Sequence, residues 1–322
     1  MKKGIQSREA CIYLTQLLML LFSLPTVAQQ VTVEWAEGYD SQGTTSESSG
    51  YVGKMIIAVD EDGNSYVAGR SMNYNTYRAN IVTTKHSPAG EELWVRVYEG
   101  VLNSEPTAIA VDNAGGVYVT GVSVTGYERY DALHYGTDYL TVRYSALDGT
   151  LTWDETYNGA GNGSDVARAV AVDTLGGVYV TGESYSGSSG IDYTTIRYAA
   201  SDGTLTWGMT YNGIRNSYDY GRAIAVDNLG GVYVTGASWS GARRIKYTTI
   251  RYAASDGTLT WGKTYKWASN SYDYGRVIVV DNLGGVYITG ESWSGACKNN
   301  YMTIRYAASD GTLTWDEAEY PE

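Results

Sequence analysis

Apolar and polar residues alternate along most of the chain with a period of two, which is typical of β-strands. The pattern is clearest between residues 222 and 265, where it predicts four strands, called A to D, at 222–227, 232–235, 247–252 and 258–265. In the fourth of these strands, Leu259, Trp261, Lys263 and Tyr265 share one face. No helical period is sustained beyond the first thirty residues. The pattern therefore predicts an all-β protein.

The four-strand pattern recurs about every 55 residues, and an Asp at the end of strand A marks each copy. Glycines at 230–231 and at 257 predict the A–B and C–D turns, because Gly adopts positive φ freely. The second copy carries an insertion between Gly121 and Arg143. Four short antiparallel strands in tandem copies are typical of β-propeller blades, so we expect blades near 54–99, 107–158, 167–212, 221–266 and 275–320. The five marker residues are Asp60, Asp112, Asp173, Asp227 and Asp281.

Strand D carries a Trp, and there is one more of these tryptophans than there are A strands. Trp35 lies in a strand-like segment, 31–40, that precedes the first blade and has no A to C strands of its own. Two interpretations follow: a closed five-bladed ring with one D strand redundant or swapped across the closure, or an incomplete part of a longer ring. The other five strand-D tryptophans are Trp94, Trp153, Trp207, Trp261 and Trp315.

The stretch from Asp219 to Gly236, followed by the turn Gly257 and Trp261, resembles the bacterial SBBP β-propeller repeat. Five concordant copies cover most of residues 31–322. The Gly-x-x-x-Trp element also resembles the tryptophan-docking segment of quinoprotein propellers. This likeness implies that the strand-D tryptophans pack between neighbouring blades. The family name implies seven blades, from which five copies depart.

The first 28 residues have the features of a signal peptide. Lys2, Lys3 and Arg8 precede an apolar run at 11–24, and small residues follow at 26–28. We therefore expect a propeller domain at 29–322 that is secreted, periplasmic or on the cell surface, with no membrane span. The net charge is −12 and becomes more negative without this basic segment. An acidic protein is not expected to bind nucleic acid.

The marker aspartates are candidates for a cation site, because strand A is the innermost strand of a blade and the five carboxylates could gather at one channel mouth. A Ca²⁺ ion would suit such oxygen ligands. The competing interpretation is that each Asp bonds the backbone of its own A–B turn, which needs no metal. This second interpretation suits a residue that every copy repeats, so no cofactor is expected.

Arginines mark a second candidate site. We expect Asp-x-x-Arg pairs at the opposite end of strand A and further arginines from strand C, forming either an anion site or ion pairs between blades. The pairs are Asp165/Arg168, Asp219/Arg222 and Asp273/Arg276, and the strand-C residues are Arg143, Arg197, Arg251 and Arg305.

Aromatic residues mark a third candidate. Tyr185, Trp239 and Trp293 are expected in the B–C loops, one in each of three blades. With small polar neighbours, such residues suit contacts with sugars or proteins. The competing interpretation is that each covers the end of its own blade.

Signatures of an enzyme are scarce. His86 and His134 lie in different contexts, and Cys297 is the single cysteine beyond the leader. We therefore expect a monomeric, non-catalytic binding or scaffold module for carbohydrate or protein. The alternative is an extracellular enzyme on a propeller scaffold, either a polysaccharide hydrolase or lyase or a quinoprotein-like oxidoreductase.

Overall fold

A computed structural model describes residues 55–319, apart from residues 74, 126–135, 214–215, 217, 240–244, 266–271 and 294–298. The described part consists of β-strands and one short 3-10 helix, η1 (Gly187–Ser189). The prediction of an all-β fold is confirmed. Within this part, no helix is long and apolar enough to cross a membrane. The predicted signal peptide and the segment 31–40 lie outside the described residues.

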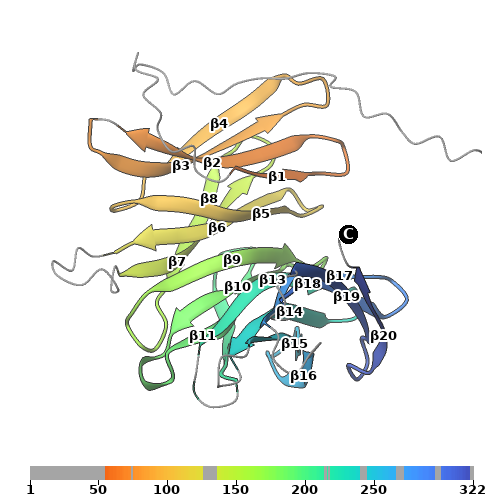
Figure 1. Ribbon diagram of the computed structural model, residues 1–322. Helices are drawn as coiled ribbons and strands as arrows, with labels where there is room; N and C mark the ends of the chain where they lie inside the picture. Colours follow the sequence, from red (N-terminus) through yellow and green to blue (C-terminus); the bar gives the residue numbers. More distant parts are fainter. Residues whose placement is uncertain are drawn as a thin grey trace, which may run out of the picture. The chain divides into compact units, whose positions relative to one another are not determined.

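The strands form consecutive antiparallel sheets of four, each a blade with strands in the order A to D (Figure 1). Blade one has β1 (Ile56–Val59), β2 (Ser65–Asn73), β3 (Arg78–His86) and β4 (Glu92–Tyr98), and blade two has β5 (Ser104–Val111), β6 (Gly116–Val124), β7 (Thr137–Ser145) and β8 (Leu151–Tyr157). Blade three has β9 (Asp165–Val172), β10 (Gly177–Tyr185), β11 (Ile191–Ala199) and β12 (Leu205–Tyr211).

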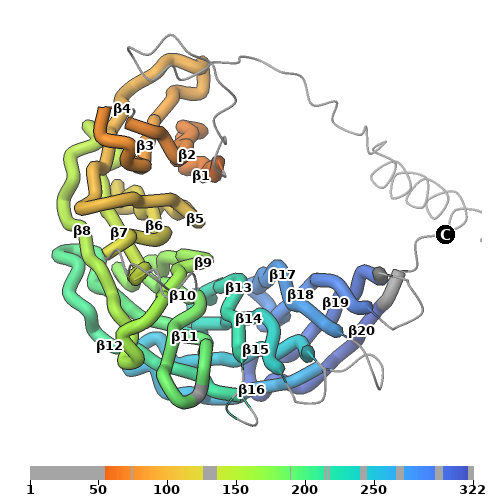
Figure 2. The backbone as a smooth tube through the Cα atoms, turned by 60° about the vertical axis from the view of Figure 1, so that its left-hand side comes forward, coloured from red at the N-terminus to blue at the C-terminus, as the bar shows by residue number. Residues whose placement is uncertain are grey.

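Blades four and five follow in the same order (Figure 2). Blade four has β13 (Asp219–Val226), β14 (Gly231–Trp239), β15 (Ile245–Ala253) and β16 (Leu259–Tyr265), and blade five has β17 (Tyr272–Val280), β18 (Gly285–Trp293), β19 (Asn299–Ala307) and β20 (Leu313–Glu319). A single parallel pairing, Ile245 with Tyr272, joins the two blades into one continuous sheet. The β-propeller architecture predicted from the repeat is confirmed.

The tight turns give every blade two distinct ends. At the end we call the turn end lie the A–B and C–D turns, where Gly230 and Gly257 have φ values of 84° and 74°. The backbone closes these turns through bonds such as Asp227 N to Gly231 O, at 3.0 Å, and Gly257 N to Ala253 O, at 2.9 Å. At the other end, which we call the loop end, strand A begins and strand B passes into strand C.

The hydrophobic core lies between neighbouring blades. Each layer combines aromatic residues of one blade with aliphatic residues of the next, which buries both faces of an interior sheet. Between blades three and four the buried residues are Tyr179, Tyr193 and Trp207 on one side and Val232, Val234, Ile250 and Tyr252 on the other. Corresponding clusters form at the other three junctions.

In the described part of the chain, the first and last blades each have one face with no neighbouring blade. On these faces, residues are exposed whose equivalents in the middle blades are covered. Ile57 of β1 is 65% exposed, and Trp315 of β20 is 40% exposed, whereas Trp207 is 7% exposed. The equivalents of Ile57 and Trp315 in the interior are packed against a neighbouring blade. These two residues therefore do not cover one another, as a closed ring of five blades would require.

Candidate functional site

The marker aspartates lie at the turn end and hold their own A–B turns. Asp227 accepts hydrogen bonds from the backbone N–H groups of Leu229 (2.8 Å) and Gly231 (2.7 Å) through Oδ1. Its Oδ2 accepts one from the Tyr233 hydroxyl at 2.6 Å. Asp112, Asp173 and Asp281 make the same three contacts, and Asp60 uses Asn64 and Tyr66 in a similar way. These contacts occupy both oxygens of each carboxylate.

The strand-C arginines lie at this same turn end, so the expectation that they gather at the opposite end is wrong. Arg251 donates from Nε to the Tyr233 hydroxyl at 3.1 Å and from Nη1 to Thr260 at 3.0 Å. Its guanidinium lies over the Tyr233 ring, 5.5 Å from the centroid. The arrangement recurs at Arg143, Arg197 and Arg305. An Asp–Tyr–Arg chain thus ties strands A, B and C together in each of these blades.

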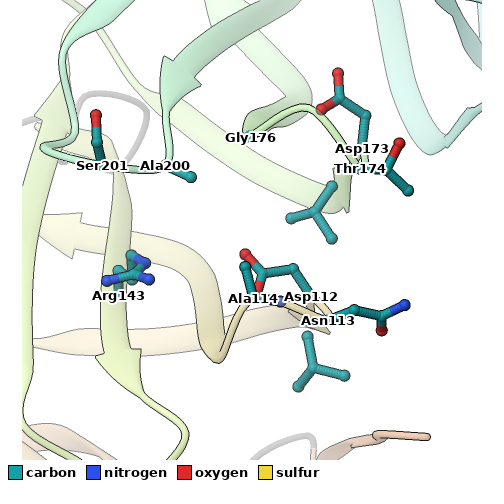
Figure 3. A pocket seen from close by; sticks show the side chains of 11 residues that line it. Asp112, Asn113, Ala114, Arg143, Asp173, Thr174, Gly176, Ala200 and Ser201 are labelled. Atoms are coloured by element: carbon teal, nitrogen blue, oxygen red, sulfur yellow. The ribbon is translucent and has the colours of Figure 1, made fainter.

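Pockets that are open to solvent lie between neighbouring blades at the turn end. One of about 580 Å³ lies between blades two and three and is lined by Asp112, Arg143 and Asp173 among others (Figure 3). A smaller one of about 350 Å³ lies between blades one and two. Within the described ranges, no three His, Cys, Asp or Glu side chains gather closely enough to hold a metal ion. The polar groups here chiefly bond one another and the turns of their own blades.

The aromatic candidates lie at the loop end, but inside strands rather than in loops. Tyr185, Trp239 and Trp293 are the last residues of β10, β14 and β18 and pair with strand C. Strand B is longer than predicted because its polar Ser238 is buried and bonded to Asp219 instead of facing solvent. Tyr185 and Trp239 are half-buried, while Trp293 is 39% exposed and packs against Tyr272 at 5.3 Å between ring centroids.

The predicted Asp-x-x-Arg pairs do not form, because these arginines bind glutamates instead. Arg168 donates from Nε and Nη2 to the two oxygens of Glu183, both at 3.1 Å. Arg222 of blade four reaches the same carboxylate, with Nη1 2.9 Å from Oε1. Arg276 binds Glu291 within blade five. Glu183, which the sequence interpretation missed, therefore links two adjacent blades.

The aspartates of that motif are buried on the other side of strand A. Asp219 accepts hydrogen bonds from Gly213 N at 2.6 Å and from Ser238. Burial raises the pKa of Asp219, and the Asp192 carboxyl of blade three raises it further. Burial likewise raises the pKa of Asp165. At the next junction Lys246 occupies the position equivalent to Asp192, and its Nζ lies 3.2 Å from Asp273.

Arg222 is the last of three side chains that lie in a row at the start of strand A, after Tyr218 and Tyr220. Tyr218 and Tyr220 stack nearly parallel, with centroids 6.4 Å apart and an interplanar angle of 8°. The Arg222 guanidinium lies over Tyr220 at 5.4 Å. Burial, together with Arg168 and Arg276, lowers the pKa of Arg222, and Glu183 opposes this shift. Its Nε is buried and has no hydrogen-bond partner within the described part of the chain.

Comparison with known proteins identifies the repeat. The family described as "Beta-propeller repeat" (SBBP) matches residues 156–188, 209–241 and 259–295. The chain contains three stretches that match the SBBP β-propeller repeat. A comparison with curated protein sequences gives no match.

Solved structures resemble the SBBP propeller in fold. A europium-containing methanol dehydrogenase has a TM-score of 0.51 at 11% identity, over 82% of this chain and 61% of that one. BamB from Moraxella catarrhalis has a TM-score of 0.44 at 12% identity, over 84% of this chain and 79% of that one. Quinohemoprotein alcohol dehydrogenase from Comamonas testosteroni has a TM-score of 0.48 at 13% identity, over 84% of this chain and 45% of that one. The chain thus spans less than two thirds of either dehydrogenase.

The strand-D tryptophans of the first four blades occupy the junctions between blades. Trp207 donates from Nε1 to Ala254 O of the next blade at 3.0 Å and packs between Tyr179 and Tyr252. Trp94, Trp153 and Trp261 make equivalent contacts. Trp315, in the last blade, packs on Tyr287 of its own blade. Trp35, His134 and Cys297 lie outside the described residues, whereas His86 is buried in β3.

The loop end differs between blades two to five, whereas the Asp–Tyr–Arg contacts of the turn end recur in all four of them. The position of Glu183 is filled by Val122 in blade two, by Ala237 in blade four and by Glu291 in blade five. Comparing the copies position by position could have found Glu183 from the sequence, because the surrounding residues are nearly identical. A site that serves one ligand needs such asymmetry, so the loop end is the better candidate for binding.

Proposed function

We propose that this SBBP propeller is an exported, non-catalytic binding module, and that it binds carbohydrate at the loop end of blades four and five. The signal peptide predicted at 1–28 supports export. The observation that carries the proposal is the pair of aromatic platforms at this end: Tyr218 stacked on Tyr220, and Trp293 packed against Tyr272.

Both platforms are accessible to a ligand. Tyr218 is 49% exposed and Trp293 is 39% exposed. Because Tyr220 supports the ring of Tyr218, and Tyr272 that of Trp293, each platform is held in place before a ligand arrives. Rigid aromatic faces with polar edges suit the apolar face of a sugar ring, and preorganisation lowers the entropic cost of binding.

A glycan array with the purified chain tests the proposal, followed by titration calorimetry on any glycan retained. Trp293→Ala and Tyr218→Ala are expected to weaken binding by about tenfold each, as the loss of a stacking contact does. Trp315→Ala is the matched control, since Trp315 is equally exposed but lies on the outer face of blade five. It should bind as the unaltered chain does.

Two results would contradict the proposal: no glycan bound at all, or equal losses in Trp293→Ala and Trp315→Ala. Shortened products after incubation with a bound glycan would favour the alternative of a polysaccharide hydrolase or lyase. If the purified chain bound a peptide and no glycan, the same surface would be assigned to protein binding.

A further inference from the structure

Blade four differs from its neighbours in the charges around its strand-A arginine. In blade three, Glu183 faces Arg168, and in blade five, Glu291 faces Arg276. The equivalent residue of blade four is Ala237, which pairs with Tyr220 across the A–B ladder as Glu183 pairs with Val166. Among the described residues of blade four, Arg222 therefore has no carboxylate beside it.

The carboxylate that Arg222 reaches is already engaged. Both oxygens of Glu183 accept hydrogen bonds from Arg168, and Oε1 is also the partner of Arg222 Nη1. The three arginines of this row, Arg168, Arg222 and Arg276, thus share two glutamates, which leaves one positive charge in excess. This excess lies at blade four, where the Arg222 side chain as a whole is 29% exposed, although its Nε is buried and not hydrogen-bonded within the described residues.

From this arrangement we infer that Arg222 is a subsite for a carboxylate of the ligand, so that the binding module selects uronic-acid glycans over neutral ones. The inference rests on the proposed function and names the ligand class for the same surface. A ligand carboxylate beside Ala237 would take the place that the Glu183 and Glu291 carboxylates have in blades three and five. Guanidinium and carboxylate groups form charge-assisted hydrogen bonds, and the exposed part of the Arg222 side chain is available for one.

The stacked tyrosines favour a glycan over an acidic peptide. Tyr218, Tyr220 and Arg222 follow one another along one face of strand A, so an aromatic platform leads directly to the guanidinium. A chain of uronic acids carries a ring and a carboxylate on each unit. It can therefore place one ring on Tyr218 while the carboxylate of a unit further along the glycan reaches Arg222.

The test introduces into blade four the glutamate that blades three and five already have at the equivalent position. Ala237→Glu gives blade four the glutamate of blade three, where Glu183 is accommodated in a buried position. Arg222→Gln removes the charge directly, and Lys263→Gln removes an equal charge from the outermost strand β16 as a control. Calorimetry with an oligogalacturonate and with a neutral galacto-oligosaccharide of equal length measures binding to the full chain and to each variant.

We expect Ala237→Glu and Arg222→Gln each to weaken oligogalacturonate binding by about tenfold or more, since a charge-assisted hydrogen bond is lost. The Lys263→Gln variant and the neutral oligosaccharide should show no such loss. Because Ala237→Glu adds an ion pair, retained thermal stability will separate loss of binding from loss of fold.

Unchanged oligogalacturonate binding in Ala237→Glu would overturn the inference while leaving the binding module intact. Equal affinity for the acidic and neutral oligosaccharides would also overturn it. Failure to bind either one would instead count against the proposed function. Binding of poly-glutamate that matches oligogalacturonate in affinity would assign the subsite to acidic peptides and overturn the glycan assignment.

Discussion

Replacement of the same tryptophan in two blades separates packing between blades from packing within one. Trp207 of blade three is 7% exposed, because blade four covers it, whereas Trp315 of blade five is 40% exposed. Both occupy the same position in strand D and pack on a Tyr of their own blade, Tyr179 and Tyr287 respectively. Trp207→Ala and Trp315→Ala therefore differ mainly in the contribution of the neighbouring blade.

The structure sets the expected size of the difference. Trp207→Ala leaves a cavity between two sheets and removes the hydrogen bond to Ala254 O, so it should cost about 3–5 kcal/mol of unfolding free energy. Trp315→Ala loses a smaller buried area and leaves no enclosed cavity. Its cost should be about 1–2 kcal/mol.

Urea unfolding followed by far-ultraviolet circular dichroism measures both values without depending on tryptophan emission. Tandem blades interact chiefly with their neighbours and need not unfold in one step, so a second probe such as limited proteolysis should trace the same transition. Equal losses for the two variants, to within about 0.5 kcal/mol, would refute the argument that inter-blade burial stabilises these tryptophans. A larger loss for Trp315→Ala would refute it as well.

Two further predictions use matched positions in the same way. Gly257→Ala should lower the unfolding free energy by about 2–4 kcal/mol, because its Cβ would lie 2.9 Å from the Trp207 ring at a positive φ. Gly230→Ala has a similar φ and open surroundings, so it should lose only about 1 kcal/mol, and a similar loss for both in thermal unfolding would contradict this. Asp192→Lys should stabilise the chain by about 1 kcal/mol at neutral pH, because the ammonium places an opposite charge beside Asp219, as Lys246 does beside Asp273. The pKa of native Asp219 is raised above 3.8, so the unaltered chain loses stability as the pH rises through that pKa and the carboxyl group ionises. Below about pH 4 the carboxyl group is protonated and has no charge for the Lys to pair with. The stability advantage of the variant should therefore vanish there. Urea midpoints across a pH series check this, and an advantage independent of pH would contradict it.

Much of the fold could be predicted from the sequence because its signals are local. Period-two alternation and turn glycines such as Gly230 and Gly257 fix four strands in each copy. The prediction failed where a polar residue is buried. Ser238 reads as the start of a loop, but it bonds buried Asp219, and strand B continues to Trp239.

The candidate site was harder to predict, because it depends on contacts between blades. Residues three apart on a strand lie on opposite faces, which is why Asp219 and Arg222 do not pair as the motif suggested. The partner of Arg222 is Glu183, 39 positions earlier in the chain and in another blade. No spacing rule within one copy could reveal this ion pair.

The differences between copies point to blade four as the blade on which the proposed binding depends. Relative to blade three it replaces Glu183 with Ala237 and Asp192 with Lys246, so each exchange makes its loop end more positive. Lys246 is neutralised by Asp273, but the charge left by Ala237 falls on Arg222. In a chain of net charge −12, one blade with an excess cation beside stacked tyrosines is where an anionic glycan would be drawn. The turn end, with the same Asp–Tyr contact in every blade, has no corresponding preference for one blade over another.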